Sequence, residues 1–393
     1  MRLLLIMPNI ISYRSFHAEL GAELCAAGAE VHVACSSNQI SAPKAKVSAV
    51  AAVPEHKGLT IHAIDFARGL NLIGHLRAAR RLAALVDELK PDIVHTHFDA
   101  AIFTTAIARN SRWPTLLATF HGLSYPTFHG WRKTLIRTAT LWAIRHFNTV
   151  FVLNVENRDI LRAAAPRADV RMFESAGVGC DIQRFAPPSP EERETMRASL
   201  KFSADHCVLI YVGRFIEVKG FAMTARAFLK LAERNPNVRL LVVGESDALH
   251  PTGLTSEEEE AFKKSPQIVA VGRRPDVERY LAAADVLMLP SYREGVPVCL
   301  MEALAVGVPV VTRDACGCRD VVRDKVDGTV LRECTVETNA AEMKRLADSP
   351  ELRREMSLQA LAGRDRFDRR HFVREQKEIY EAIMRQKSRV PNE

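Results

Sequence analysis

The stretch "DVLMLPSYREGVPVCLMEALAVGVPVVT", residues 285–312, holds a complete strand–loop–helix–strand pattern. Its first apolar run predicts a buried strand, "YREG" predicts a loop, and "VCLMEALAVG" predicts a helix that ends at Gly307 before a second strand. Glu294 and Glu302 interrupt this apolar unit with seven residues between them. Because burying an unpaired carboxylate is costly, we expect both to serve a ligand.

The alternation of short β-rich runs with helical stretches continues in both directions from this unit. "LLLIM", "EVHVACS" and "DIVHTH" lie upstream, and after a break rich in Pro and charge at 185–197 the pattern restarts with "CVLIYVG" and "VRLLVVG". Such alternation is typical of βαβ units. It predicts an α/β fold of two Rossmann-like parallel-sheet domains, 1–185 and 186–369, that face each other across a cleft, followed by a helical tail.

The composition fits this two-domain prediction. The 393 residues are 47% apolar and 26% charged, which is typical of globular proteins. No apolar run is long enough to cross a bilayer, and the start "MRLLLIM" is better interpreted as a strand, Leu3–Met7, than as a signal peptide. The net charge of +7 lies in the first half, because residues 1–180 hold 20 Lys and Arg against 13 Asp and Glu. This excess either meets an anionic partner or is only a solvated surface.

Cysteine and histidine usage does not predict a metal site. The eight cysteines follow no framework spacing, and the pair "CGC" at Cys316 and Cys318 has no second pair to complete a ligand set. We expect reduced thiols in a cytoplasmic protein. His95 and His97 in "VHTH" resemble metal ligands, but no third ligand is placed, and we interpret them as structural or cleft-lining residues.

Two cations follow a predicted strand in "YVGRFIEVKGF", residues 211–221. The strand ends at Val212, and Gly213 then lets the backbone approach a ligand closely. Arg214 and Lys219 suit a diphosphate, which Arg grips as a fork and Lys meets as a point charge. The alternative is two surface cations on a loop. The spacing matches neither a Walker loop nor a dinucleotide fingerprint.

The helix after "YREG" predicts a second anion-binding element. Pro297 suits the first helical position, so the free amides around Val296 to Cys299 form a site for an anion. Glu294 and Glu302 flank this site, and carboxylates accept hydrogen bonds from vicinal hydroxyls of a sugar or ribose. The arrangement fits a nucleotide diphosphate sugar. The alternative is that Glu294 caps the helix and Glu302 is solvated.

These motifs together resemble the retaining family-4 glycosyltransferases of the GT-B fold. The matching stretches are "VGRFIEVKG", "ADVLMLPS", "EGVPVCLME" and "GVGCDIQRF", and the likeness is strongest from 205 to 331. The resemblance implies that a hexose or N-acetylhexosamine is transferred from a nucleoside-diphosphate sugar to a hydroxyl. The expected donor is a UDP-sugar, and the anomeric configuration is retained. It also implies that a C-terminal helix, about 370–393, packs back on the first domain, and that neither a cofactor nor a metal is required.

The resemblance assigns roles to individual residues. His121 and Glu294 would act at the transferred sugar, while Arg214 and Lys219 would neutralise the leaving diphosphate and Glu302 would hold the ribose. Arg273 or Arg274 would lie nearest the base. The complete set expected at the donor is Gly213, Arg214, Lys219, Arg273, Arg274, Glu294, Gly295, Val296, Pro297, Val298 and Glu302.

One departure from the family pattern concerns the acceptor. The loop after the first strand, "MPNIISYRSF", lacks the glycines that many members carry there. The chain thus most resembles the subgroup that acts on lipid-diphosphate-linked sugars in glycan or cell-envelope polysaccharide assembly, with Arg14 near acceptor phosphate. The basic, apolar stretch 129–147 has two interpretations. It either lies on the anionic inner face of the cell membrane, or packs on the first sheet as a scaffold helix.

Other functions fit the sequence less well. A nucleotide-sugar epimerase shares the architecture but needs acid and base groups for proton abstraction. A non-catalytic binding protein is disfavoured by the intact Arg214, Lys219, Glu294 and Glu302. A transferase with a small soluble acceptor stays open. Nucleic acid is not an expected partner, because no aromatic-and-basic recognition motif is present.

Overall fold

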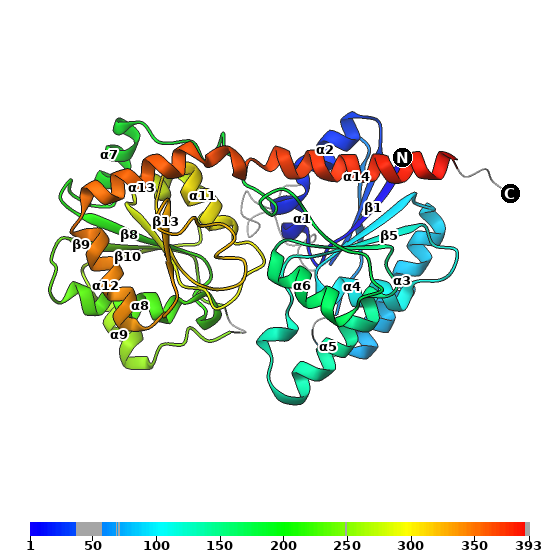
Figure 1. The fold of residues 1–393 in the computed structure, drawn as a ribbon, viewed down its shortest axis with the longest axis horizontal. Helices are drawn as coiled ribbons and strands as arrows, with labels where there is room; N and C mark the ends of the chain where they lie inside the picture. The colour runs from blue at the N-terminus through cyan, green and yellow to red at the C-terminus, as the bar shows by residue number, and fades with distance from the viewer. Residues whose placement is uncertain (37–56, 68, 70, 248–249, 390–393) are drawn as a thin grey trace. The chain divides into compact units, whose positions relative to one another are not determined.

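The structure is a computed structural model that describes residues 1–393 except 37–56, 68, 70, 248–249 and 390–393. The chain divides into two compact units, Met1–Gly177 with Arg370–Glu393, and Val178–Arg369. Each unit is built around one sheet in which every described strand pairing is parallel (Figure 1). The prediction of two Rossmann-like parallel-sheet domains is confirmed.

The first unit contains a seven-stranded sheet in the order β3-β2-β1-β4-β5-β6-β7. Its strands are β1 (Arg2–Ile6), β2 (Glu30–Cys35), β3 (Leu59–Ala63), β4 (Ile93–His97), β5 (Thr115–Phe120), β6 (Thr149–Val152) and β7 (Val170–Met172). Its helices are α1 (Ile10–Phe16), α2 (Ala18–Ala26), α3 (Leu72–Leu89), α4 (Asp99–Ala108), the 3₁₀ turn η3 (Tyr125–Thr127), α5 (Gly130–Ile144), α6 (Val155–Ala164) and α14 (Arg369–Arg389).

The second unit contains a six-stranded sheet in the order β10-β9-β8-β11-β12-β13. Its strands are β8 (Cys207–Val212), β9 (Val238–Val243), β10 (Ile268–Gly272), β11 (Val286–Leu289), β12 (Val310–Arg313) and β13 (Gly328–Leu331). Its helices and 3₁₀ turns are α7 (Pro190–Ser199), η4 (Glu217–Lys219), α8 (Phe221–Ala232), α9 (Ser256–Lys264), α10 (Val277–Ala283), α11 (Val298–Val306), α12 (Val336–Ala347), α13 (Pro350–Ala362) and η5 (Arg364–Phe367).

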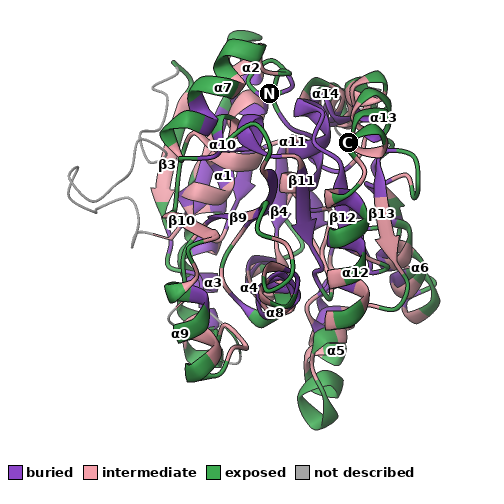
Figure 2. Cartoon of the chain, turned by 90° about the vertical axis from the view of Figure 1, so that its left-hand side faces the viewer, coloured by how far each residue is buried: buried purple, intermediate pink, exposed green. Residues whose placement is uncertain are grey.

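The central strands form the cores of both units. β4 and β11 are buried on both faces, as Figure 2 shows in purple, because helices cover each side of the sheet. Among the covering helices, α3 is amphipathic and buries Ala78, Leu82 and Val86 along one stripe while its other faces stay exposed. None of the helices in the described part of the chain combines the length and the apolar character that a bilayer crossing needs.

The boundary between the units differs from the expected break at 185/186. Residues 178–185 belong to the second unit, where Cys180 forms a β-bridge with Asp368. Arg364 also donates to the backbone oxygens of Ile182 and Phe185. The Pro-rich stretch that follows is therefore a connection inside the second unit, and the composition shift marks the wrong place.

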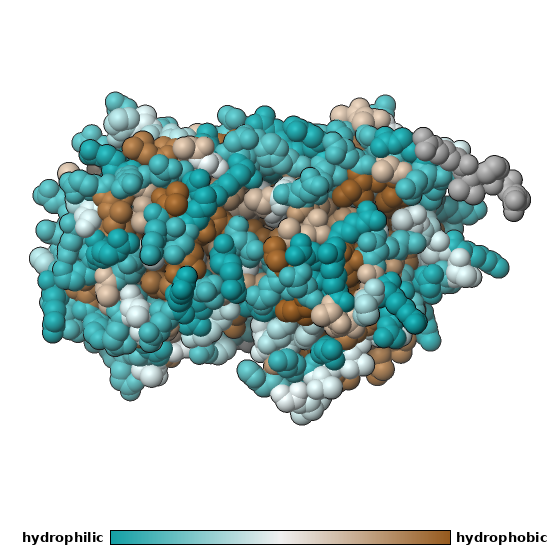
Figure 3. Space-filling model, in the orientation of Figure 1, coloured by the Kyte–Doolittle hydropathy of each residue, from teal (hydrophilic) through white to brown (hydrophobic). Residues whose placement is uncertain are grey.

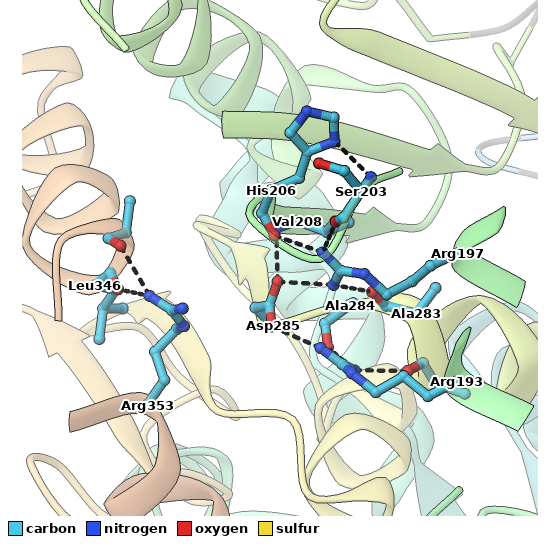
Figure 4. A network of polar contacts seen from close by, with 12 residues as sticks. Arg193, Arg197, Ser203, His206, Val208, Ala283, Ala284, Asp285, Leu346 and Arg353 are labelled. Atoms are coloured by element: carbon cyan, nitrogen blue, oxygen red, sulfur yellow. Dashed lines mark hydrogen bonds and ion pairs between the residues drawn. The ribbon is translucent and has the colours of Figure 1, made fainter. Parts of the chain in front are cut away.

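A partly buried carboxylate fixes α7 to the second sheet (Figure 4). Asp285, just before β11, accepts hydrogen bonds from Arg193 at 2.6 Å, from Arg197 at 3.2 Å and from the backbone N–H of Val208 at 2.7 Å. The Asp285 side chain is 14% exposed and that of Arg197 is 9% exposed. These contacts explain why the charged segment that begins at Pro190 is ordered rather than a free linker.

The C-terminal helix α14 packs along the first unit. Its Tyr380 hydroxyl lies 2.6 Å from His95 Nδ1, and Lys377 pairs with Glu23 at 2.8 Å. Lys387 donates to the backbone oxygen of Asp92 at 2.5 Å. The chain thus returns to its first unit after completing the second, and the helix expected at about 370–393 begins at Arg369.

Candidate functional site

The site in the second unit lies where β8 and β11 end. The carboxyl ends of parallel strands lie at one edge of a sheet, which is the usual ligand-binding edge. η4 follows β8 and contributes Lys219, and the loop after β11 contributes Glu294. Lys219 Nζ donates to both carboxylate oxygens of Glu294, at 2.6 and 2.7 Å. The sequence placed both residues at a ligand but did not predict this direct pair.

The two loops are tied together through their backbones. Gly220 has a φ of +74°, and a Cβ there would lie 2.5 Å from the backbone oxygen of Pro290, so only glycine fits. The N–H of Tyr292 donates to the oxygen of Val218 at 2.9 Å. The loop that carries Lys219 is therefore held against the loop that carries Glu294.

A turn after β12 supports Glu294 from the other side. The N–H of Glu294 donates to the backbone oxygen of Cys316 at 3.0 Å. A Cβ at Gly317 would approach the backbone oxygen of Gly295 to 2.3 Å, so this turn also packs backbone against backbone. Cys318 is buried, and burial raises its pKa to about 12, so its thiol stays neutral. None of the eight cysteines, all of which lie in the described part of the chain, forms a disulfide.

The Lys219–Glu294 pair is largely shielded from water. The Glu294 side chain is 10% exposed and that of Lys219 is 27% exposed. Burial alone would lower the pKa of Lys219, but the charge and hydrogen bonds of Glu294 outweigh it, and the net direction is upward. The ammonium is therefore charged throughout the physiological range.

Glu302 lies on α11, one turn beyond the helix start, and is mostly enclosed by protein. Burial raises the pKa of its carboxyl to about 7, although the charges of Arg369 and Arg184 act in the opposite direction. It is thus not the solvated helical residue of the alternative interpretation. A carboxyl that titrates near neutrality accepts hydrogen bonds from hydroxyls best once it is ionised.

The start of α11 differs from the prediction by one position. Pro297 has a φ of −76° and a ψ of 113° and forms the N-cap, so Val298 rather than Pro297 is the first helical residue. Among the described residues, no side chain caps this helix end. Gly295 and Val296 lead into it directly from Glu294.

Arg214 is held by an aspartate that the sequence analysis missed. Its Nη1 lies 2.5 Å from Asp247 Oδ2, and its side chain is 53% exposed. The hydroxyl of Tyr211 donates to the backbone oxygen of Arg214 at 2.8 Å and fixes the turn that begins at Gly213. Asp247 follows β9, so its position after a strand is the sequence feature that could have indicated it as a site residue.

The two arginines after β10 are oriented by local contacts. Arg273 lies 3.6 Å from Glu245, and both side chains are about half exposed. Arg274 donates to the backbone oxygen of Val271 at 2.9 Å and lies over the ring of Tyr280. No described contact joins either arginine to Lys219 or Glu294, so their part in a site stays a prediction.

In the first unit, His121 follows β5 and is enclosed by aromatic rings. It stacks on Phe98 with centroids 4.2 Å apart and on Phe16 with centroids 5.2 Å apart. His97 Nδ1 lies 3.2 Å from His121 Nε2. Burial lowers the pKa of His121 to about 3, so the imidazole is neutral. Arg14 lies on α1, two residues before Phe16, and burial lowers its pKa.

His95 has a structural role. Its two ring nitrogens lie 2.6 Å from the Tyr380 hydroxyl and 2.7 Å from Thr119 Oγ1, so both are occupied within the fold. Burial lowers the pKa of His95 to about 3. Within the described residues, no group of three or more His, Cys, Asp or Glu side chains is arranged to hold a metal ion.

Comparison with known families gives two matches that together span most of the chain. Residues 14–176 match the family model described as "Glycosyl transferase 4-like domain". Residues 192–362 match the model described as "Glycosyl transferases group 1". The second match contains both loops of the Lys219–Glu294 site, and the first contains His121.

Several curated proteins are similar along much of their length. "Putative glycosyltransferase EpsD" from Bacillus subtilis (strain 168) is 26% identical over 315 residues, which is 79% of this chain and 81% of that protein. "UDP-Gal:alpha-D-GlcNAc-diphosphoundecaprenol alpha-1,3-galactosyltransferase" from Escherichia coli is 24% identical over 285 residues, which is 72% of this chain and 73% of that protein.

Solved structures share the fold over nearly the whole chain. Sucrose-phosphate synthase from Thermosynechococcus elongatus has a TM-score of 0.79 at 19% identity, with 98% of this chain and 100% of that chain covered. Anabaena Alr3699/HepE in complex with UDP and glucose has a TM-score of 0.77 at 18% identity, with 98% and 99% covered. These likenesses identify the fold as GT-B.

Proposed function

Because this chain belongs to the glycosyltransferases that the group 1 and 4-like families describe, we propose that it is a retaining hexosyltransferase that uses a nucleoside-diphosphate sugar. The donor is a UDP-sugar, and the transferred unit is a hexose or an N-acetylhexosamine. The acceptor is a hydroxyl of a glycan or lipid-linked sugar in polysaccharide assembly. The observation that carries the proposal is the enclosed Lys219–Glu294 pair at the carboxyl edge of the second sheet.

The proposal gives Lys219 the leaving diphosphate as its second partner. A phosphate oxygen competes with Glu294 for the ammonium, and the freed carboxylate then accepts hydrogen bonds from hydroxyls of the transferred sugar. Arg214 and the backbone amides of Val296 and Val298, at the start of α11, add positive charge where the diphosphate gains negative charge. Preorganised charge of this kind stabilises a transition state without reorganisation of solvent.

Glu302 binds the ribose hydroxyls in this proposal, and Arg273 or Arg274 lies beside the base. His121 meets the transferred sugar as a neutral imidazole, since its pKa is about 3. The place of His121 at the donor sugar is part of this proposal. The departing phosphate takes the proton of the acceptor hydroxyl on the same face of the transferred sugar. In this proposal, the positive groups named above stabilise the leaving diphosphate, and neither a metal nor a cofactor takes part.

We propose a cytoplasmic protein that attaches peripherally to the inner face of the cell membrane. The support is α5, whose described side chains include exposed Trp131, Arg132, Lys133 and Arg137 and no acidic residue. An aromatic and basic helix of this kind binds anionic lipid through both buried apolar area and charge. A relative that is named for a diphosphoundecaprenol-linked substrate supports the same location.

The test combines donor screening with paired variants. We expect UDP, more than GDP or ADP, to raise the melting temperature, and labelled UDP-sugars to label a lipid extract. Lys219→Met and Glu294→Gln should lower kcat by about 10² to 10³, as removal of one stabilising donor does elsewhere. Lys230→Met is the control, because Lys230 pairs with Glu337 at 2.9 Å in an exposed position on α8.

Two results would overturn the proposal. One is an equal loss of activity in the Lys230 variant and the Lys219 variant. The other is conversion of the donor sugar to its epimer without any acceptor, which would point to a nucleotide-sugar epimerase.

A further inference from the structure

The first unit contains an apolar cavity of about 620 Å³ that the proposed donor site does not use. It lies among α3, α4, α5 and the segment after β5. Its apolar lining includes Leu72, Phe98, Phe103, Phe128, Leu135 and Ala139. Its volume lies within the range of about 300 to 1,000 Å³ that is typical of ligand sites.

The cavity lies at the ligand-binding edge of the first sheet. Pro8 follows β1, Phe98 follows β4 and Ser124 follows β5, and all three line it. Phe98 also stacks on His121 with an angle of 13° between the ring planes. One aromatic ring therefore separates the cavity from the histidine that we place at the transferred sugar.

Apolar side chains around the cavity remain exposed without an apparent folding role. Leu72 is 56% exposed and Leu135 is 44% exposed, although both line the cavity. Trp142 is 40% exposed and packs edge-on against Phe103. Ile73, beside Leu72, is 66% exposed. In Figure 3, brown and pale residues emerge among teal ones at the lower right of the view, where α3 and α5 lie. Grouped exposure of this kind marks a binding surface.

The polar features around the cavity favour an amphiphile with an anionic head. α5 forms one wall and carries Arg132, Lys133 and Arg137 without an acidic residue among its described positions. Asp99 also lines the cavity and accepts a hydrogen bond from Ser124 at 3.2 Å, and burial raises its pKa to about 6. This acid repels a phosphate, so an anionic head lies away from Asp99, on the side of α5. An apolar interior beside a cationic helix complements a hydrocarbon chain that ends in phosphate.

We propose that this cavity binds the part of the hydrocarbon chain nearest the diphosphate of a lipid-linked acceptor. This inference rests on the proposed function, because it assumes a lipid-diphosphate acceptor rather than a free glycan. The hydrocarbon lies inside the cavity, and the phosphate lies at its rim between α3 and α5, beside the cations of α5 and away from Asp99. The cavity thus selects lipid-linked acceptors.

The first experiment measures binding of farnesyl phosphate by tryptophan fluorescence, with inorganic phosphate for comparison. Ala139→Phe fills the cavity, whereas Thr138→Phe adds the same ring at the adjacent exposed position of α5. We expect the wild type and the Thr138 variant to bind farnesyl phosphate alike and the Ala139 variant to bind at least 10-fold more weakly. Equal binding by all three proteins, or equal affinity for inorganic phosphate, would overturn the inference.

A second pair of variants avoids any added bulk in the interior. Leu135→Glu places a negative charge at the rim, and Thr134→Glu makes the same change at an exposed position that does not line the cavity. Only the Leu135 variant should lose affinity for farnesyl phosphate. If both variants lose affinity equally, general attraction to the basic helix accounts for binding and the cavity does not.

A vesicle assay separates the acceptor chain from bulk membrane lipid. Sedimentation with phosphatidylglycerol vesicles should be the same for the wild type and the Ala139 variant, because a membrane surface meets the exposed face of α5. A parallel loss of vesicle binding would assign the cavity to a bilayer lipid and refute the acceptor inference. Stabilisation by UDP is measured on every variant, so failure of the donor proposal remains distinguishable from failure of this one.

Discussion

Replacing Glu302 by glutamine should stabilise the folded protein and weaken nucleotide binding. The ordinary pKa of a glutamate carboxyl is 4.5, and burial raises that of Glu302 to about 7. Below about pH 4.5 the carboxyl is protonated in both states, and between pH 4.5 and 7 the folded state binds more protons than the unfolded state. Stability therefore falls as the pH rises through this window, and the loss is complete above pH 7.

The size of the effect follows from the shift. Each pKa unit is worth about 1.4 kcal/mol, so ionised Glu302 costs up to about 3 kcal/mol at pH 8. An amide does not titrate and carries no such cost. We expect the stability difference between Glu302→Gln and wild type to rise by up to about 3 kcal/mol from pH 4.5 to pH 8. Urea denaturation at several pH values measures this difference, and Glu355→Gln, at an exposed position of α13, is the control.

The same substitution should reduce discrimination at the ribose. Hydrogen bonds to a charged group contribute about 1.5 to 3 kcal/mol, so wild type should prefer UDP over 2′,3′-dideoxy-UDP by roughly 10- to 100-fold. Glu302→Gln should lose most of this preference. A stability difference that stays flat from pH 4.5 to 8 would refute the burial argument. An unchanged preference between the two nucleotides would refute the ribose assignment.

Two further predictions concern buried charge in the second unit. Lys219→Met leaves Glu294 enclosed and unpaired, so it should lower the free energy of unfolding by about 2 to 4 kcal/mol. In a double-mutant cycle, Lys219→Met/Glu294→Leu should recover most of that loss, and a double variant as unstable as the single one would contradict the coupling. Asp285→Ala leaves the guanidinium of Arg197 without its carboxylate and should lower the free energy of unfolding by about 3 kcal/mol, while UDP affinity at low temperature stays unchanged. An unaltered melting temperature would show that this network adds nothing to stability.

The parallel α/β architecture was predictable because it depends on local pattern. A strand that is buried on both faces must be almost continuously apolar, as "LLLIM" and "DVLMLP" are, and the helices between such strands repeat their apolar positions every three or four residues. The first strand, β1, begins at Arg2 and ends at Ile6, one position earlier at each end than expected. Ends depend on individual hydrogen bonds, which a pattern does not specify.

The domain boundary was misplaced because composition does not report packing. The stretch with prolines and charges near residue 185 has the composition of a linker, yet Arg193 and Arg197 bind a single carboxylate of the second sheet. Charged residues in a segment can be evidence of a specific partner rather than of solvation. That partner, Asp285, lies about 90 residues further along the chain, beyond the reach of any local pattern.

Pairings inside the candidate site were unpredictable for the same reason. The sequence placed Arg214 and Lys219 together as two cations on one loop. In the structure each has its own acid from a different loop, since Arg214 pairs with Asp247 and Lys219 pairs with Glu294. Position after a strand brought all four residues to one edge of the sheet, but only side-chain geometry decides which charges neutralise each other.

These pairings suggest how such a site stays stable without a substrate. Two cations at one strand edge would repel each other and attract water, but the acids neutralise them in the free protein. Lys219 is the more enclosed of the two, at 27% exposed against 53% for Arg214. In the proposed function, an incoming diphosphate therefore meets Arg214 first in a solvated position and displaces Glu294 from Lys219 only once it is bound. On that proposal, the carboxylate is released for sugar hydroxyls after the diphosphate is in place, so binding of the diphosphate sets up the contacts on which transfer depends.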